Sequence, residues 1–193
     1  MSKKNKPNPP QIATPAALIR LDVGCGPNKK GPEWLGIDAI KFPGVDVVQD
    51  LRKPWPFKDG SVEEIHCSHC IEHFTAPERC HVYNEMWRVL RVGGKSLCIT
   101  PAWSSGRAYG DPTHQWPPVS SFSYYYLLRS WREANAPHSD AKHWAPGYKC
   151  DFDVTWGFSL HPQIVTRNQE YQQFALNFYM EAAQDLIATF VKR

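Results

Sequence analysis

The chain has 193 residues, which is enough for one domain with a sizeable core and too few for two ordinary domains. Apolar residues make up 42% of it and charged residues 21%, a globular composition, and no stretch approaches the roughly 20 apolar residues of a membrane helix. The net charge of +3 is too small to indicate a nucleic-acid-binding protein by itself.

The amino-terminal segment is basic and rich in proline, and no apolar run follows it. This composition predicts a disordered tail at residues 1–15 rather than a signal peptide, with the folded domain at residues 16–193. Without a secretory segment, the six cysteines are expected to be reduced thiols, and the protein is expected to be cytoplasmic.

Short apolar runs predict the strands of a sheet in the first half of the chain. They cover residues 18–23, 34–37, 45–48, 62–67 and 96–100. A helix is expected from Pro77 to Leu90, ended by Gly93-Gly94. Strands that alternate with helices or crossover loops predict a single Rossmann-like, doubly wound α/β domain with a mainly parallel sheet.

The amino-acid composition changes over residues 102–149, which are rich in Pro, Ser, Trp and Tyr. Long irregular connections in a compact domain are usually functional, so we predict an aromatic lid there, with one helix at residues 121–133. Further on, residues 152–160 predict a strand and residues 168–181 a helix. The β-branched residues of segment 186–191 favour an antiparallel closing strand over a continuing helix.

Three predicted strands end in residues that suit a nucleoside. The first ends in Asp22-Val23-Gly24-Cys25-Gly26, the second in Asp38 and the third in Asp50. In a parallel sheet these ends lie at one edge, near the point where ligands bind. The glycines allow close approach of a ligand, Asp38 suits a ribose diol, and Asp50 can accept a hydrogen bond from an adenine amino group.

The loop after the first strand is a poor anion site. A dinucleotide fingerprint needs a third glycine that opens a helix, but Lys29 stands there, and Pro27, Gly31 and Pro32 leave little room for a helix. S-adenosylmethionine carries no phosphate, so it does not need that site. Asp22 could hold its amine, directly or through water.

Five segments in matching order resemble class I S-adenosylmethionine-dependent methyltransferases, and in particular the small methyltransferase type 11 group. The resemblance lies in Leu21–Pro27, Gly36–Asp38, Val48–Phe57, Ser61–Phe74 and Trp87–Gly94. It implies S-adenosylmethionine as cofactor and S-adenosylhomocysteine as product, and it is silent about the acceptor. The chain departs from the family pattern in two places. Asn28 stands where the family usually has a third glycine, and the helix that normally follows the first motif is missing.

The resemblance also implies which residues line the cofactor. These are Gly24, Cys25, Gly26, Asp38, Asp50 and Leu51, with Cys67, Ser68 and His69 passing beneath the methionine part.

Histidines are the candidates for the catalytic base, because an imidazole with an ordinary pKa near 6.5 can take a proton from a hydroxyl or amine acceptor. His114 lies in the predicted lid, from which it could reach the pocket, and is the first choice. His73 is the second, and His69 lies on the same face if a helical turn follows the fourth strand. Packing or capping is the alternative role for each.

Two alternatives concern other kinds of site. His66, Cys67, His69, Cys70 and His73 could together bind structural zinc. Neighbours in a strand point to opposite faces, however, and a second ligand pair at ordinary spacing is lacking, so no metal is predicted. A methyltransferase-like scaffold without activity is the other alternative.

The acceptor is expected to be a small molecule, because the chain has no strong basic face. Nucleic acid is the second candidate. The Asn/Asp-Pro-Pro-Tyr/Phe motif of enzymes that methylate amino groups of nucleic acids is absent after the fourth strand, where Ser68-His69-Cys70-Ile71 stands. No membrane association is expected, and the oligomeric state is not predicted.

Overall fold

A computed structural model describes residues 19–136 and 147–193 of the chain. The predicted tail at residues 1–15 lies outside the described residues, as does segment 137–146 of the predicted lid.

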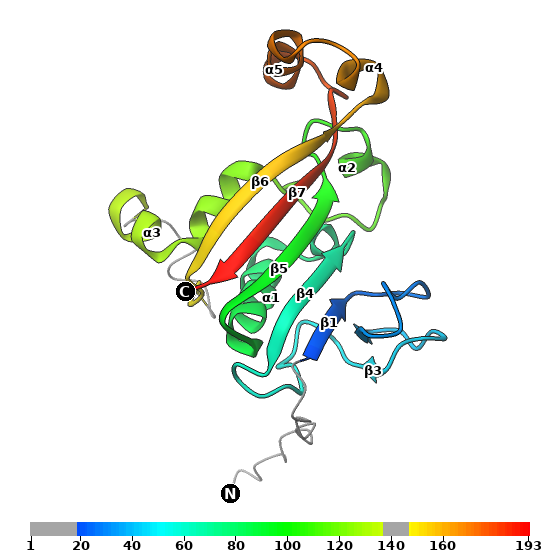
Figure 1. Ribbon diagram of the computed structural model, residues 1–193, viewed down its shortest axis with the longest axis vertical. Helices are drawn as coiled ribbons and strands as arrows, with labels where there is room; N and C mark the ends of the chain where they lie inside the picture. Colours follow the sequence, from blue (N-terminus) through cyan, green and yellow to red (C-terminus); the bar gives the residue numbers. More distant parts are fainter. Residues whose placement is uncertain (1–18, 137–146) are drawn as a thin grey trace, which may run out of the picture.

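A seven-stranded sheet in the order β3-β2-β1-β4-β5-β7-β6 forms the centre of the molecule (Figure 1). Strands β1 to β5 run parallel to one another, whereas β7 is antiparallel to both β5 and β6. The predicted α/β fold, with a mainly parallel sheet and an antiparallel closing strand, is therefore confirmed. The bounds are β1 Ile19–Val23, β2 Leu35–Asp38, β3 Val47–Val48, β4 Val62–Ser68, β5 Leu90–Pro101, β6 Phe152–Leu160 and β7 Ala183–Lys192.

Helix α1 (Ala76–Val89) covers one face of the central strands and starts and ends for clear reasons. Thr75 and Glu78 form a capping box, in which the Thr75 N–H donates to Glu78 Oε2 at 2.9 Å. Its apolar face, with Val82, Met86 and Val89 fully buried, packs into the core. The helix ends where Leu90 becomes extended, so Gly93-Gly94 lies inside β5 and does not terminate the helix as predicted.

The connection after β5 contains α2 (Arg107–Gly110), the 3₁₀ helix η2 (Ser121–Leu127) and α3 (Arg129–Asn135). The single helix predicted over residues 121–133 is wrong, because Leu128 adopts an extended conformation between two separate helices. Tertiary packing explains the break. Residues three apart eclipse each other in a 3₁₀ helix, which places both Tyr124 and Leu127 in the core.

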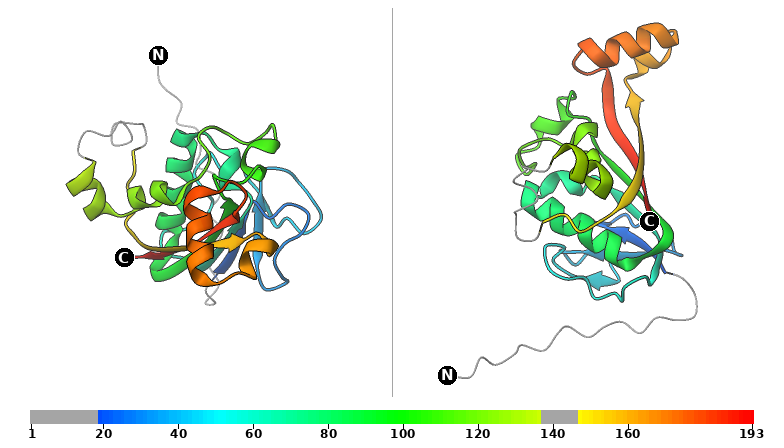
Figure 2. Two further views of the ribbon diagram at one scale, coloured as in Figure 1. Left: turned by 90° about the horizontal axis from the view of Figure 1, so that it is seen from above. Right: turned by 90° about the vertical axis from the view of Figure 1, so that its left-hand side faces the viewer.

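The hairpin of β6 and β7 extends beyond the rest of the sheet and carries α4 (Pro162–Val165) and α5 (Gln169–Phe178) at its tip (Figures 1 and 2). Phe174 and Phe178 of α5 are exposed there. Among the described residues, no helix is both long and apolar enough to cross a membrane.

Candidate functional site

A cleft of about 390 Å³ opens at the carboxyl ends of the first four strands. Gly24 follows β1, Asp38 ends β2, Asp50 follows β3, and His69 follows β4. The structure therefore brings the predicted strand ends to one cavity. The lining residues are Gly24, Asp38, Ala39, Ile40, Phe42, Asp50, Leu51, Arg52, His69, Cys70, His73 and Phe74.

The glycine loop after β1 closes one wall of this cleft. Gly24 has a φ of +66°, and its N–H donates to the Ile37 carbonyl at 2.9 Å. A Cβ at Gly24 would lie 2.4 Å from Cys70 Sγ, so this position requires glycine. Gly26, also in the left-handed region, donates its N–H to Asp38 Oδ2 at 2.9 Å. The loop is thus joined to the end of β2.

Asp38 and Asp50 keep hydrogen-bonding capacity toward the cleft. Each Asp38 oxygen accepts one backbone N–H, from Gly26 and Ile40, and a carboxylate oxygen can accept a second. Asp50 Oδ1 accepts from the backbone N–H and the Nε of Arg52 at 3.1 and 2.9 Å. The Arg52 hydrogen bond holds the pKa of Asp50 below its ordinary value, so this carboxylate is ionised at neutral pH.

Several residues predicted to contact the cofactor, either from the resemblance or, for Asp22, from its place at the end of the first strand, do not line the cleft. Asp22 is buried and accepts hydrogen bonds from His66 Nδ1 and the Lys30 N–H, both at 2.8 Å. The other predicted cofactor residues that do not line the cleft are Cys25, Gly26, Cys67 and Ser68. Burial, together with the Asp22 and Asp38 carboxylates, raises the pKa of Cys25 to about 11.

Cys67 belongs to a buried group of thiols with Cys70 and Cys98. Hydrogen bonds with these two thiols, together with burial, favour the protonated form and raise the pKa of Cys67, so its thiol is neutral. All six cysteines are free and buried.

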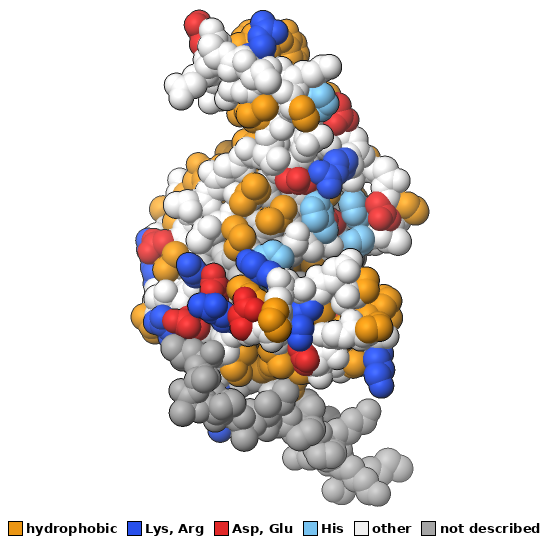
Figure 3. All heavy atoms as spheres, turned by 45° about the vertical axis from the view of Figure 1, so that its right-hand side comes forward, with side chains coloured by type: hydrophobic (Ala, Val, Ile, Leu, Met, Phe, Trp, Pro, Cys, Tyr) orange, Lys and Arg blue, Asp and Glu red, His pale blue; other side chains and the backbone are white. Residues whose placement is uncertain are grey.

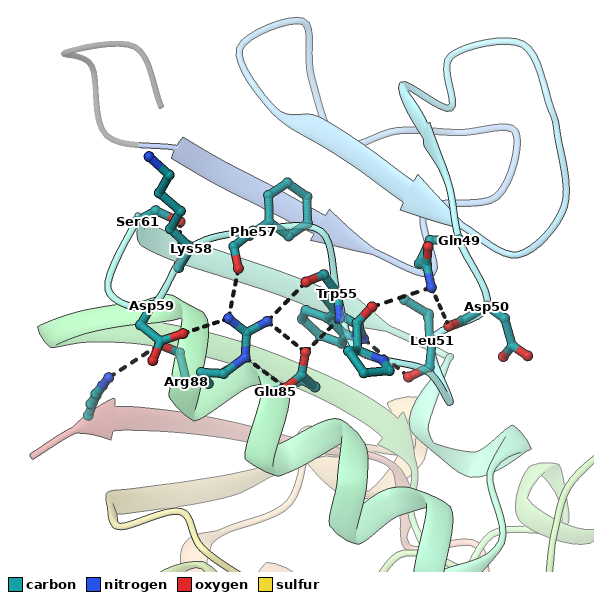
Figure 4. Close-up of polar contacts among 12 residues, drawn as sticks. Gln49, Asp50, Leu51, Trp55, Phe57, Lys58, Asp59, Ser61, Glu85 and Arg88 are labelled. Carbon is teal, nitrogen blue, oxygen red and sulfur yellow. Dashed lines mark hydrogen bonds and ion pairs between the residues drawn. The ribbon is translucent and has the colours of Figure 1, made fainter. Parts of the chain in front are cut away.

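A polar network on α1 supports the segment that carries Asp50 and Leu51 (Figure 4). Arg88 donates to the carbonyls of Phe57 and Trp55 at 2.7 and 3.0 Å and forms a two-point ion pair with Glu85. Trp55 Nε1 in turn donates to the Leu51 carbonyl at 3.1 Å. Sequence analysis assigned Arg88 only to the motif at the helix end. Arg88 and Trp55 are far apart in the sequence, so no local pattern could predict this contact.

The turn after β4 presents His69 to the cleft. His69 has a φ of +52°, in the left-handed region, and its Nδ1 lies 3.2 Å from Glu72 Oε1. Glu72 is buried at 4% exposure in the 3₁₀ helix η1 (Ile71–His73). The hydrogen bond that His69 donates to Glu72 raises the pKa of His69 above its ordinary value. The structure thus places a histidine–carboxylate pair at the edge of the cleft.

The predicted lid brings His114 against His73, with ring centroids 4.8 Å apart in an edge-to-face arrangement. His73 lines the cleft, whereas His114 does not. The Gln115 N–H donates to the Glu72 carbonyl at 2.8 Å, which fixes the His114 segment beside η1. Figure 3 shows histidine side chains gathered on one face of the molecule.

Comparison with known proteins gives a family match for part of the chain and a fold match for most of it. Residues 28–98 match the family model described as a methyltransferase domain. A solved structure of an S-adenosylmethionine-dependent methyltransferase from Archaeoglobus fulgidus is similar, with a TM-score of 0.62 at 18% identity, over 92% of this chain and 87% of that one. Residues 28–98 thus match a methyltransferase domain, and the chain shares the fold of an S-adenosylmethionine-dependent methyltransferase.

Two further structures share the fold of this chain. Geranyl diphosphate C-methyltransferase from Streptomyces coelicolor A3(2) has a TM-score of 0.55 at 14% identity, over 92% of this chain and 71% of that one. Phosphoethanolamine N-methyltransferase 2 from Haemonchus contortus has a TM-score of 0.51 at 16% identity, over 91% of this chain and 48% of that one. A search of the curated proteins gave no match.

Proposed function

We propose that this chain is a methyltransferase that binds S-adenosylmethionine in the cleft at the strand ends and transfers its methyl group to a small-molecule acceptor. The observation that carries the proposal is the convergence of Gly24, Asp38 and Asp50 on one cavity. In this arrangement Asp38 accepts hydrogen bonds from the ribose hydroxyls, and Asp50 accepts one from the adenine amino group. Leu51 packs against the adenine, and Gly24 allows the cofactor to approach the backbone.

The methyl group would then face the end of the cleft lined by His69 and His73. Methyl transfer is an in-line displacement at a sulfonium, so the protein has mainly to align the acceptor and exclude water. Because Glu72 Oε1 can only accept, the Nδ1–H of His69 donates to it. Nε2 of the neutral ring then accepts a hydrogen bond from an acceptor hydroxyl or amine. We place His69 rather than His114 in contact with the acceptor, since His114 does not line the cleft.

Two similarities support a small acceptor. The structures that share this fold include one in complex with geranyl diphosphate and one in complex with phosphomonomethylethanolamine, both with S-adenosylhomocysteine. Nothing in the described residues favours nucleic acid over such a molecule. The free state of all six thiols supports residence in the cytoplasm, a reducing compartment.

Calorimetry with S-adenosylmethionine and S-adenosylhomocysteine tests the proposal directly. We expect one molecule of either to bind each chain, followed by transfer from methyl-labelled cofactor to a member of a small-molecule acceptor panel. A folded protein that binds neither compound would overturn the proposal. Binding without transfer to any acceptor would instead support the scaffold alternative.

A further inference from the structure

Three side chains beside the cleft form a cluster of metal-ligand atoms that the cofactor site does not use. One oxygen of Glu72 and one ring nitrogen each of His73 and His114 all lie within 4.8 Å of one another. Glu72 and His73 come from η1, whereas His114 comes from the connection after β5. We propose that these three residues bind a zinc ion at the acceptor end of the cleft.

Hydrogen bonds fix the orientation of both imidazoles for this role. Thr113 Oγ1 donates its proton to Asp111 Oδ1 at 2.6 Å, so it can only accept from His73 Nδ1, which lies 2.9 Å away. His114 Nδ1 lies 3.2 Å from the Ala108 carbonyl, which also can only accept. Both neutral rings therefore carry their proton on Nδ1 and their lone pair on Nε2. Metal-ligating histidines are usually held in this way by a second partner.

Neither Nε2 atom has a hydrogen-bond partner within the described part of the chain. The nearest carboxylate to His114 Nε2 is Asp111 Oδ2 at 4.0 Å, too far for a hydrogen bond. Both lone pairs are therefore available to a cation.

The buried oxygen of Glu72 is the observation that points to a ligand. Glu72 is 4% exposed, and its Oε1 is paired with His69, but its Oε2 is buried with no hydrogen-bond partner among the described residues. An unpaired buried carboxylate oxygen is costly, and a bound cation would satisfy it. Glu72 would then connect the zinc ion to the histidine at the cleft.

The donor set fits zinc. Two imidazole nitrogens and one carboxylate oxygen, with a fourth position open, form a ligand set used by catalytic zinc sites. At bond lengths of about 2.0–2.2 Å, tetrahedral ligand atoms lie roughly 3.3–3.6 Å apart, so the three groups need to close by about 1 Å. This site shares only His73 with the cysteine–histidine cluster considered from the sequence, in which His66 is bonded to Asp22 and Cys67 is in the core.

The role of the zinc ion rests on the proposed function. His73 lines the cleft, so the open coordination position can hold an acceptor oxygen there. Coordination lowers the pKa of a hydroxyl, whose proton leaves to His69 or solvent. The oxygen then forms a bond to the methyl carbon while the carbon–sulfur bond breaks, and the sulfur keeps the electron pair.

Metal content of the untagged protein tests the site without any assay of methyl transfer. After removal of metal with a chelator, we expect one Zn²⁺ to rebind per chain. Co²⁺ should give a visible spectrum without a thiolate charge-transfer band. Glu72→Gln, His73→Gln and His114→Gln should each weaken Zn²⁺ binding at least tenfold, whereas His161→Gln at the distant hairpin tip should not.

Calorimetry with S-adenosylhomocysteine on the same proteins separates the two proposals. Variants that bind S-adenosylhomocysteine but no longer bind zinc support the metal site. A wild-type protein that binds zinc but not S-adenosylhomocysteine counts against the proposed function and leaves the metal site standing. Absence of Zn²⁺ or Co²⁺ binding to the wild-type protein overturns the metal site. A thiolate band, or unchanged Zn²⁺ affinity in all three variants, would overturn it as well and point to cysteine ligands.

Discussion

The two ends of the cleft are built differently. We call the part lined by Asp38 and Asp50 the donor end, after the proposed methyl donor, and the part beside His73 and His114 the acceptor end. Asp38 and Asp50 each stand where a strand ends, so the parallel sheet alone brings them together. At the acceptor end, His73 and His114 come from segments about forty residues apart, joined by hydrogen bonds between irregular stretches. The donor end depends on a regular repeat of the fold, whereas the acceptor end depends on a few individual contacts. Single substitutions should therefore damage the acceptor end more.

Substitution of Arg79 should give the largest loss of stability and so tests this contrast most strongly. It is buried, and it donates to the carbonyls of Ile71 and Glu72 on one side and of Gln115 and Pro117 on the other. Arg79→Ala should lower the free energy of unfolding by about 4 kcal/mol, because it leaves buried carbonyls unpaired. Denaturant titration measures this, and Arg91→Ala, in a half-exposed pair with Glu63, should cost less than about 1 kcal/mol. Equal losses in the two variants would contradict the contrast.

Arg88 tests whether the donor end has a weak point of its own. Arg88→Ala removes the contacts to Trp55 and Glu85 and should cost about 3 kcal/mol of stability. It should also weaken S-adenosylhomocysteine binding, since the segment with Asp50 and Leu51 loses its support. Arg88→Lys serves as the control: it keeps the charge without the planar fork and should recover part of the stability. If affinity is unchanged in a folded Arg88→Ala protein, the network does not position the adenine site.

Asp38 should affect the ligand more than the fold. Asp38→Ala is expected to weaken S-adenosylhomocysteine binding by about 2 kcal/mol, through loss of charge-assisted hydrogen bonds to the ribose. Calorimetry measures the change. Asp153→Ala, in a surface pair with Arg193 on β6, is the matched control and should bind like the wild type. Unchanged affinity in the Asp38 variant would show that Asp38 does not bind the ribose.

The smallest expected effect is the pH dependence that Asp50 contributes. Because Arg52 lowers its pKa in the folded protein, Asp50 stabilises the fold above its ordinary pKa near 3.8, and this contribution is lost as the pH falls through the folded value. The pair is largely exposed, so the contribution should stay below about 1 kcal/mol. Asp50→Asn should therefore be slightly less stable than the wild type at pH 7 and equal to it at pH 2. A constant difference at both values would exclude this ion pair as the cause.

The contrast between the two ends also explains what the sequence could predict. Asp38 and Asp50 were found because strand ends are visible as apolar runs followed by an acidic residue. The contact between His73 and His114 was not, since no local pattern reports which lid residue meets which turn. The same limit applies to residues 121–133, where the burial of Tyr124 and Leu127 overrides the helical pattern. It also applies to Arg88, whose partners lie some thirty residues away.

The fit of Gly24 against Cys70 links the two ends. The glycine loop, which we propose receives the methyl donor, touches the residue that starts the histidine turn, at a point with no room for one more carbon. Any displacement of that loop would therefore press directly on the turn that carries His69 and His73.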